Sequence, residues 1–354
     1  MNICFCNTNK SWGGGEKWHL EMATAFSELE GYKVSFLLAE KSVLNQKINS
    51  EKIHKLLFDV NKFSFLNPFK SSRLKKLLLA HHFDLIIFNG PNELKLVAKV
   101  AKACGIKKII YRRGSDKVIK NSFINRNLLE NIVTNIIANS EATRLSLLKS
   151  GIRIEDKIQV INNGIIPPKN KYPENKNNPT VIGALGRLEP QKGFDLLIQS
   201  ASVLKNMAVD FKLIIGGSGS KETELRALVT ENNLEENIEF AGFIEDSYGF
   251  LSKCDVFALS SRYEGFGYVM VEAMFCSLPV VAYNTSSAKE IVIHNETGLL
   301  IENYNINEFA NALAQLIKNK EFCIELGQKG NQRAFDYFSF GDSVNKIKKI
   351  FEDQ

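Results

Sequence analysis

Apolar and polar residues alternate along the first half of the chain with two different periods. Short apolar runs predict buried strands at Ile3–Asn7, Val34–Leu38, Leu85–Asn89, Lys108–Tyr111, Ile136–Asn139 and Ile158–Ile161. Between the first two runs, large apolar side chains recur at helical spacing after Glu16, at Trp18, Met22, Phe26 and Leu29. Strands that alternate with amphipathic helices are typical of a parallel, doubly wound sheet. The first half is therefore predicted to form an α/β domain.

The same alternation starts again after a polar segment rich in proline. Residues 167–179 contain four of the eight prolines and little that is apolar, which predicts a surface linker. Further strands are expected at Val181–Leu185, Lys212–Gly216, Ile238–Ala241, Asp255–Leu259 and Pro279–Tyr283, with helices from about Phe194, Glu222 and Gly267. We therefore predict an N-terminal domain over residues 1–166, a second domain over 180–340, and a C-terminal helix over 341–354 that packs back on the first domain.

Charge is distributed unevenly between the two halves. Residues 1–165 carry 26 Lys and Arg against 14 Asp and Glu, a net charge of +12, whereas the remainder carries −6. A basic half suggests an anionic partner, for which a membrane surface and nucleic acid are the main candidates. The apolar runs are far shorter than the roughly 20 residues of a spanning helix. The N-terminus also runs into an apolar strand without a basic leader, so a cytoplasmic protein is expected.

Cysteine and histidine give no sign of a metal site. The six cysteines lie mostly in apolar runs, which favours buried thiols over a metal site or a disulfide framework. The five histidines form no pair at ligand spacing on a helix. We expect no metal and no cofactor.

The loops after the strands of the second half carry unusual chemistry. The segment GRLEPQKGFD, residues 186–195, places Arg187 and Lys192 around a proline turn just before a helix that opens at Gly193. Two cations beside a helix N-terminus make an anion site, and a diphosphate fits it because a guanidinium binds two oxygens in a fork. The alternative is a solvated loop with two ordinary surface cations. The glycines around Gly217 in GGSGS would let backbone approach a ligand closely, although their spacing matches neither nucleotide-binding glycine motif.

The segment SSRYEGFGYVMVEAM, residues 260–274, is the most informative. Glu264 lies in a glycine-rich turn, and Glu272 lies two turns into an otherwise apolar helix. A buried carboxylate is costly unless it is hydrogen-bonded, and ribose hydroxyls are suitable donors. Backbone N–H groups around Phe266 would face the same diphosphate as Arg187 and Lys192.

These segments together resemble the retaining glycosyltransferases of family 4, which have the GT-B fold of two facing Rossmann-like, doubly wound domains. The resemblance spans nearly the whole chain. It rests on WGGGEK at 12–17, IANSEAT ending at Thr143, NNG at 162–164, GRLEPQKG at 186–193, IIGGSG at 214–219, AGF at 241–243 and the two glutamates separated by seven residues. The combination is specific, while no single piece is.

The resemblance implies a role for each matching position. Arg187 and Lys192 would hold the donor diphosphate, Glu272 the ribose, and Glu264 the sugar near its reacting carbon. The catalytic candidates are accordingly Glu264, Arg187 and Lys192. The other donor-binding candidates are Gly13, Gly14, Gly15, Gly217, Gly265, Phe266, Gly267 and Glu272. Gly13 to Gly15 would close over the diphosphate from the first domain.

Two segments depart from the family pattern. Many members have a histidine after the strand that here ends at Tyr111, whereas this chain continues with Arg112, Arg113 and Gly114. We therefore take Arg113, together with Glu16, as candidates for contact with the sugar or the acceptor. The second departure is the loop NTSSAKEI, which keeps Glu290 but lacks the usual glycines.

The resemblance implies transfer of a hexose from a nucleotide-diphosphate sugar, most readily a UDP-sugar, with retention at the anomeric carbon. The acceptor would be a lipid-linked or cell-surface glycan precursor of polysaccharide biosynthesis, and the protein would meet the inner face of the membrane peripherally. The chain has no Asp-x-Asp motif, which agrees with protein cations in place of a metal.

Three other functions are weighed against this one. A nucleotide-sugar epimerase of similar fold would convert the donor without any acceptor. It would need a catalytic acid and base near the sugar, and the scattered histidines offer no candidates for them. A non-catalytic sugar-nucleotide sensor is disfavoured by the intact cation pair and glutamates. A nucleic-acid-binding protein would use the basic half, but no RNA or DNA module is recognisable, so no nucleic-acid partner is expected.

Overall fold

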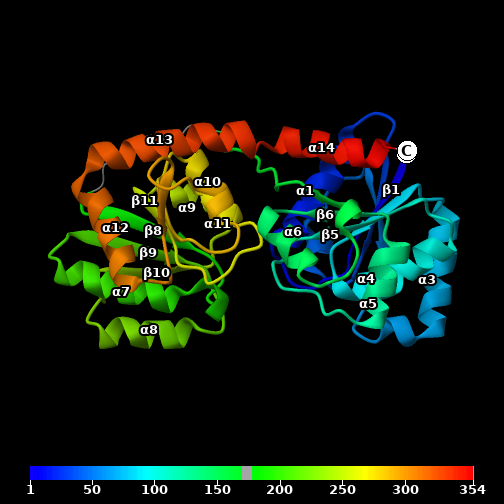
Figure 1. Cartoon of the computed structure of the whole chain (residues 1–354), viewed down its shortest axis with the longest axis horizontal. Helices are drawn as coiled ribbons and strands as arrows, with labels where there is room; N and C mark the ends of the chain where they lie inside the picture. The colour runs from blue at the N-terminus through cyan, green and yellow to red at the C-terminus, as the bar shows by residue number, and fades with distance from the viewer. Residues whose placement is uncertain (170–177, 354) are drawn as a thin grey trace. The chain divides into compact units, whose positions relative to one another are not determined.

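The structure is a computed structural model that describes residues 1–169 and 178–353 (Figure 1). The chain divides into two compact units. Unit one is Met1–Asn163 together with the C-terminal residues from Ser343, and unit two is Gly164–Asp342. Within the predicted linker, residues 167–179, residues 170–177 lie outside the described residues, as does Gln354.

Unit one is built on a seven-stranded sheet of order β3-β2-β1-β4-β5-β6-β7. Its strands are β1 Asn2–Asn7, β2 Lys33–Leu38, β3 Ile53–Leu57, β4 Leu85–Phe88, β5 Lys108–Arg113, β6 Asn135–Ala138 and β7 Ile158–Val160. Each described pair of neighbouring strands is parallel. The helices are α1 Gly14–Glu28, α2 Val43–Lys47, η1 Ser64–Leu66, α3 Pro68–His81, α4 Pro91–Ala103, α5 Phe123–Asn127, η2 Leu128–Ile132, α6 Glu141–Leu148, η3 Glu155–Lys157 and α14 Phe340–Glu352.

The core of unit one explains why its central strands are continuous apolar runs. All four residues of β4 are buried, because helices cover both faces of a parallel sheet. The C-terminal helix α14 belongs to this core: the ring of Phe351 lies 4.8 Å from that of Phe26 and 6.4 Å from that of Phe5, measured between centroids. Residues far apart in sequence therefore share one core.

Unit two is built on a six-stranded sheet of order β10-β9-β8-β11-β12-β13. Its strands are β8 Thr180–Leu185, β9 Phe211–Gly216, β10 Ile238–Gly242, β11 Val256–Leu259, β12 Val280–Tyr283 and β13 Gly298–Ile301. The described pairs are again parallel. The helices are η4 Pro190–Lys192, α7 Phe194–Asn206, α8 Glu222–Glu231, α9 Ser247–Leu251, α10 Tyr268–Phe275, α11 Ala288–Ile291, α12 Ile306–Lys318 and α13 Lys320–Tyr337.

The predicted class of two parallel-sheet α/β domains is confirmed. The predicted strands are present with ends that differ by one or two residues, whereas β3 and β13 were not predicted. β3 is an edge strand in which three of the five residues are exposed, so it lacks the continuous apolar run of a central strand. β13 is only four residues long and follows a polar turn.

Each sheet reverses its strand order at one point, between β1 and β4 in unit one and between β8 and β11 in unit two. The connections that leave these neighbouring strands diverge to opposite sides, which opens a crevice at the carboxyl ends. Ligands of open α/β sheets bind in such crevices. The loops after β1, β4, β8 and β11 are therefore where side-chain chemistry matters most.

Helix α13 fixes α10, the helix that carries Glu272. The Asn331 side chain donates hydrogen bonds to the carbonyl oxygens of Met274 and Phe275 at 3.2 and 2.8 Å, which satisfies the C-terminal end of α10. The close approach of α13 to the residues after α10 also needs a glycine at position 327. A Cβ added to Gly327 would lie 2.0 Å from the carbonyl oxygen of Ser277.

We predict that Gly327→Ala destabilises unit two although alanine is the better helix former. Overpacking against backbone costs about 1 to 3 kcal/mol, which outweighs a gain in helix propensity of about 1 kcal/mol or less. Gly330→Ala in the same helix is the matched control, because its added Cβ would meet no atom closer than 3.4 Å. Urea unfolding should show a lower midpoint for the first variant alone. Equal midpoints for the two would contradict this packing.

Candidate functional site

In unit two, two loops meet at the carboxyl end of the reversal point. We call them the switch-point loops: residues 186–193, after β8, and residues 260–267, after β11. β8 and β11 are hydrogen-bonded neighbours, so the loops that leave them begin side by side. The predicted residues Arg187, Lys192 and Glu264 all lie on these two loops.

Hydrogen bonds join the two switch-point loops along their length. The backbone N–H of Arg262 donates to the carbonyl oxygen of Gln191 at 2.8 Å, and the Gln191 side chain donates to the carbonyl oxygen of Tyr263 at 3.0 Å. The Ser260 hydroxyl donates to the carbonyl oxygen of Lys192 at 3.0 Å. The loops are therefore fixed against each other, and their side chains share one geometry.

A bidentate ion pair adds to this clamp. The Arg262 guanidinium donates to both carboxylate oxygens of Asp195, at 2.8 and 2.6 Å, and to the carbonyl oxygen of Pro190 at 2.8 Å. Hydrogen bonds from Arg262 lower the pKa of the Asp195 carboxyl. Sequence reasoning missed both residues, because Arg262 and Asp195 are 67 positions apart and each resembles an ordinary surface charge.

The chemical centre of the site is the ion pair of Lys192 and Glu264. Lys192 Nζ lies 2.5 Å from Glu264 Oε1, and the two side chains are only 15% and 9% exposed. The Ser261 hydroxyl donates to the same carboxylate oxygen at 2.7 Å. Since either charge would be costly to bury alone, each holds the other in place. An entering anion can replace the carboxylate as the partner of Lys192, because charge-assisted hydrogen bonds to phosphate are of the same kind.

Ser287 fixes the turn that carries Glu264 through hydrogen bonds to its backbone. This buried serine donates to the carbonyl oxygens of Glu264 and Phe266, at 3.3 and 2.9 Å. Gly267 then adopts a left-handed conformation, φ +84°, at the start of α10. Sequence reasoning also missed Ser287, which belongs to the glycine-poor loop NTSSAKEI. The serine there supports the neighbouring turn.

The remaining predicted residues of unit two surround this pair. Arg187 is exposed, while its loop is tied to the next one by Leu188 N–H, which donates to the carbonyl oxygen of Ser218 at 2.9 Å. Gly217 has φ +138°, and a Cβ there would lie 1.8 Å from the carbonyl oxygen of Gly186. Glycine is therefore required at 217 by close backbone approach. Glu272 is buried in α10, as expected from its apolar neighbours.

In unit one, the glycine-rich loop follows β1 at the reversal point of that sheet. Gly15 lies against the residue that follows β4, because a Cβ there would meet the Asn89 side-chain nitrogen at 2.4 Å. The predicted residue Glu16 is buried, and its Oε1 accepts hydrogen bonds from the side chains of Asn7 and Asn9, at 3.2 and 3.0 Å. In this structure Glu16 ties the loop to the end of β1.

The two arginines at the end of β5 point in different directions. Arg113, which sequence reasoning nominated, donates to the Tyr111 hydroxyl at 3.3 Å and to the carbonyl oxygen of Lys117 at 2.7 Å. Arg112 is buried, donates to Asn163 Oδ1 at 2.8 Å and lies 4.9 Å above the Trp18 ring centroid. Arg112 is therefore the one beside α1 and the glycine-rich loop. Strand alternation is the signal that could have found it, since adjacent residues face opposite sides.

A buried histidine completes this region. His19 Nδ1 lies 3.0 Å from the carbonyl oxygen of Gly15, which fixes the first turn of α1. Burial, and to a lesser extent the charge of Arg112, lower the pKa of His19 to about 3, whereas the hydrogen bond to Gly15 raises it. His19 is therefore neutral near pH 7.

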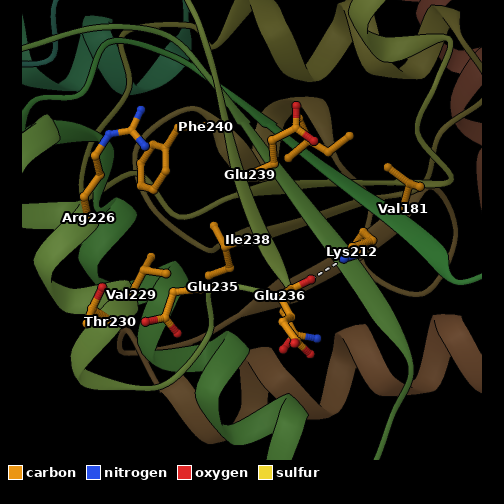
Figure 2. Close-up of a pocket in the computed structure, with 12 residues that line it drawn as sticks. Val181, Lys212, Arg226, Val229, Thr230, Glu235, Glu236, Ile238, Glu239 and Phe240 are labelled. Atoms are coloured by element: carbon orange, nitrogen blue, oxygen red, sulfur yellow. Dashed lines mark hydrogen bonds between the residues drawn. The ribbon is translucent and has the colours of Figure 1, made fainter.

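A separate hollow lies on unit two, away from the switch-point loops (Figure 2). Its volume is about 650 Å³, and it is lined by residues near the N-terminal ends of β8, β9 and β10 and by α8. Lys212 donates a hydrogen bond to the carbonyl oxygen of Glu236 beside it. The described lining contains none of the predicted site residues. This hollow is at the wrong end of the sheet for a ligand of this fold.

Neither a metal-ligand cluster nor a membrane-spanning helix is found in the described ranges 1–169 and 178–353. No three or more His, Cys, Asp or Glu side chains there are placed together so that they could hold a metal ion. None of the helices there has both the length and the apolar content needed to span a bilayer.

Comparison with known proteins matches two family models. Residues 12–169 match the model described as Glycosyltransferase Family 4, and residues 167–333 match Glycosyl transferases group 1. An uncharacterized glycosyltransferase of Methanocaldococcus jannaschii is 34% identical over 257 residues, which are 70% of this chain and 69% of that protein.

Two further similarities concern an enzyme with a named substrate and a solved structure. The N-acetylgalactosamine-N,N'-diacetylbacillosaminyl-diphospho-undecaprenol 4-alpha-N-acetylgalactosaminyltransferase of Campylobacter jejuni is 29% identical over 290 residues, 75% of this chain and 76% of the enzyme. The crystal structure of Anabaena HepE in complex with UDP and glucose superposes with a TM-score of 0.84 at 22% identity, covering 99% of each chain. The second likeness shows a common fold.

We predict that protonation of unfolded His19 makes the protein less stable as pH falls. The folded-state pKa lies below the ordinary value of about 6.5, so between pH 6.5 and 3 the unfolded chain binds a proton that the folded chain does not. This one group should cost about 2 kcal/mol of unfolding free energy between pH 6.5 and 5. His19→Asn, which keeps a donor for Gly15, should lose that part of the dependence, as measured by urea unfolding. The exposed His82→Asn is the control; an unchanged slope in His19→Asn would refute the assignment.

Proposed function

This chain belongs to the GT-B glycosyltransferases of the family 4 type, and from that premise we propose that it transfers a hexose from a UDP-sugar to a hydroxyl of a lipid-linked or cell-surface glycan precursor. The anomeric configuration is retained, and no divalent metal is needed. The observation that carries the proposal is the buried pair of Lys192 and Glu264 at the reversal point of the second sheet.

Donor binding begins with exchange of partners at this pair. The diphosphate of the donor enters between the switch-point loops, and Lys192 transfers its hydrogen bond from Glu264 to a phosphate oxygen. Arg187, which is exposed on the same loop as Lys192, binds further phosphate oxygens with two N–H groups of its guanidinium. The Anabaena protein, solved with UDP and with UDP-glucose, supports a uridine diphosphate as the group recognised.

Catalysis requires stabilisation of the charge that develops on the leaving UDP. The bond from the anomeric carbon to the diphosphate oxygen breaks, a bond to the acceptor oxygen forms on the same face, and the acceptor proton passes to a phosphate oxygen of the departing UDP. Preorganised cations at the diphosphate contribute several kcal/mol to such a step. Because Lys192 and Arg187 provide positive charge, the site has a substitute for a divalent ion. Glu264, released from Lys192, faces the sugar near its reacting carbon.

The rest of the donor is held by the same two loops and α10. Glu272, buried in that helix, accepts hydrogen bonds from the ribose hydroxyls, which offset its burial. Backbone N–H groups at Gly265, Phe266 and Gly267, at the start of α10, bind the phosphates. In unit one, the glycine-rich loop and Arg112, which lies beside it, bind the sugar or the acceptor.

Two observations support the proposed acceptor and the proposed place of the reaction. The Campylobacter jejuni relative is named for a sugar on diphospho-undecaprenol, which supports a lipid-linked acceptor here. Residues 1–165 carry a net charge of +12, which suits an anionic surface. We therefore place the protein peripherally on the cytoplasmic face of a membrane.

We predict that Arg187→Ala and Lys192→Ala each reduce transfer from a UDP-sugar by about 100-fold or more, because each removes charge stabilisation at the leaving group. The measurement is UDP release with an acceptor, in the presence of EDTA, with the anomeric configuration of the product read by NMR. EDTA should have no effect, and product should keep the donor's configuration.

Lys212→Ala is the matched control, since this exposed lysine lies at the opposite end of the same sheet. It should turn over normally. Normal turnover in both site variants, with unchanged melting temperatures, would refute the diphosphate assignment. Loss of turnover in Lys212→Ala alone would move the site to the hollow of Figure 2.

A further inference from the structure

Large apolar side chains are exposed on two connections of unit one. Phe63 is 66% exposed, Leu66 67% and Phe69 84%, all between β3 and the first turn of α3. Val118 is 55% exposed, Phe123 86% and Ile124 38%, all between β5 and the first turn of α5. Large apolar side chains that are exposed on one face of a protein can form an interaction surface.

Hydrogen bonds within the first connection, between β3 and α3, fix the backbone that carries its exposed apolar residues. Asn61 Oδ1 accepts hydrogen bonds from the N–H of Phe63 and the hydroxyl of Ser64, at 3.1 and 3.0 Å. Asn67 caps α3, and Lys70 Nζ donates to the carbonyl oxygen of Asp59 at 3.0 Å and to Ser64. The loop is thus closed by its own hydrogen bonds, and the exposed rings are not the result of a loose chain.

The second connection is fixed in the same way. Asn125 N–H donates to the Ser122 hydroxyl at 3.3 Å, and the Asn125 side chain donates to the carbonyl oxygen of Lys120 at 2.8 Å. Arg126 donates to Asn121 Oδ1 at 3.0 Å. Phe123 and Ile124 are therefore held at the start of α5.

Both connections leave the same edge of the sheet. β3 and β5 run parallel to β1 through their neighbours, so all three strands end at one edge, where the glycine-rich loop also lies. Helix α4 packs against both η1 and η2, and η2 continues α5, so the two connections flank the same helix. Figure 1 shows α3, α4 and α5 in unit one. We call these connections together, residues 58–69 and 114–124, the docking edge.

Cations accompany the exposed rings. Residues 58–83 contain five Lys and Arg against one Asp, and residues 114–127 contain three against one Asp. Seven of the eight are exposed: Lys62, Arg73, Lys75, Lys76, Lys117, Lys120 and Arg126. Exposed aromatic rings with cations nearby in sequence match the headgroup boundary, where aromatic rings insert and cations meet anionic phosphates.

We infer that the docking edge inserts into an anionic membrane surface and so brings unit one to a lipid-linked acceptor. This inference rests on the proposed function for the acceptor, but the surface itself is argued from exposure and charge. The occupant is a membrane because the apolar groups are separate protrusions among like charges, whereas a stable dimer needs a broad, complementary apolar face.

The test is cosedimentation of the full chain with vesicles of phosphatidylcholine alone or with phosphatidylglycerol, at low and high salt. The wild type should bind only the anionic vesicles, and less at high salt. Lys62→Ser with Lys120→Ser, which removes two exposed cations of the docking edge itself, should weaken binding about 30-fold. Phe69→Ser with Phe123→Ser should weaken it by about tenfold or more for each ring.

Matched controls come from the same chain. Lys33→Ser with Lys107→Ser removes two exposed cations where β2 begins and just before β5, at the opposite edge of the same sheet. Phe243→Ser removes a ring that is 74% exposed on unit two. Both controls should bind anionic vesicles as the wild type does.

Different outcomes would contradict the docking edge and the proposed function. Absence of anionic preference in the wild type, or equal weakening by the controls, would overturn the docking edge. Self-association in sedimentation velocity that the Phe69 and Phe123 variant abolishes, without vesicle binding, would assign the surface to a second copy and overturn it too. Stabilisation by UDP in a thermal-shift assay should be unchanged in all variants. Vesicle binding with no transfer from any UDP-sugar would instead refute the proposed function while leaving the docking edge intact.

Discussion

The structure depends on one constraint: neighbouring strands in both sheets are parallel, so within each sheet every strand leads out at the same edge. Reversal of the strand order between β8 and β11 then sends two adjacent loops to opposite sides, which opens a crevice between them. In a sheet of mixed direction the same two loops would be separated by the length of a strand. Lys192 and Glu264, 72 residues apart, meet at 2.5 Å for this reason.

The loops need more than position, because a lysine and a glutamate on mobile segments would remain solvated and apart. Arg262 and Asp195 tie the start of α7 to the loop after β11, and Ser287 supports the turn from beneath. Because an unpaired buried charge is costly, Lys192 stays paired with Glu264 unless another anion replaces the carboxylate. In the proposed function, a diphosphate takes the place of the carboxylate as the partner of Lys192.

Sequence reasoning predicted the strands and singled out the candidate loops because both signals are local. An apolar run of four to six residues predicts a central strand, and Arg187, Lys192 and Glu264 are unusual within their own short segments. It did not predict interactions between residues that are far apart in the sequence. Nothing near Arg262 indicates its pairing with Asp195, and β3 is an edge strand without an apolar run. The choice between Arg112 and Arg113 depends on which face of β5 each residue takes.

The most direct test of the account compares UDP with UMP as ligands of the wild type and of the variant that combines Arg187→Ala with Lys192→Ala, by isothermal titration calorimetry. If these two cations receive the second phosphate, the wild type should bind UDP at least about tenfold more tightly than UMP, and the variant should lose that preference. Equal affinities in the wild type, or the same preference in the variant, would contradict the claim that the switch-point loops recognise a diphosphate.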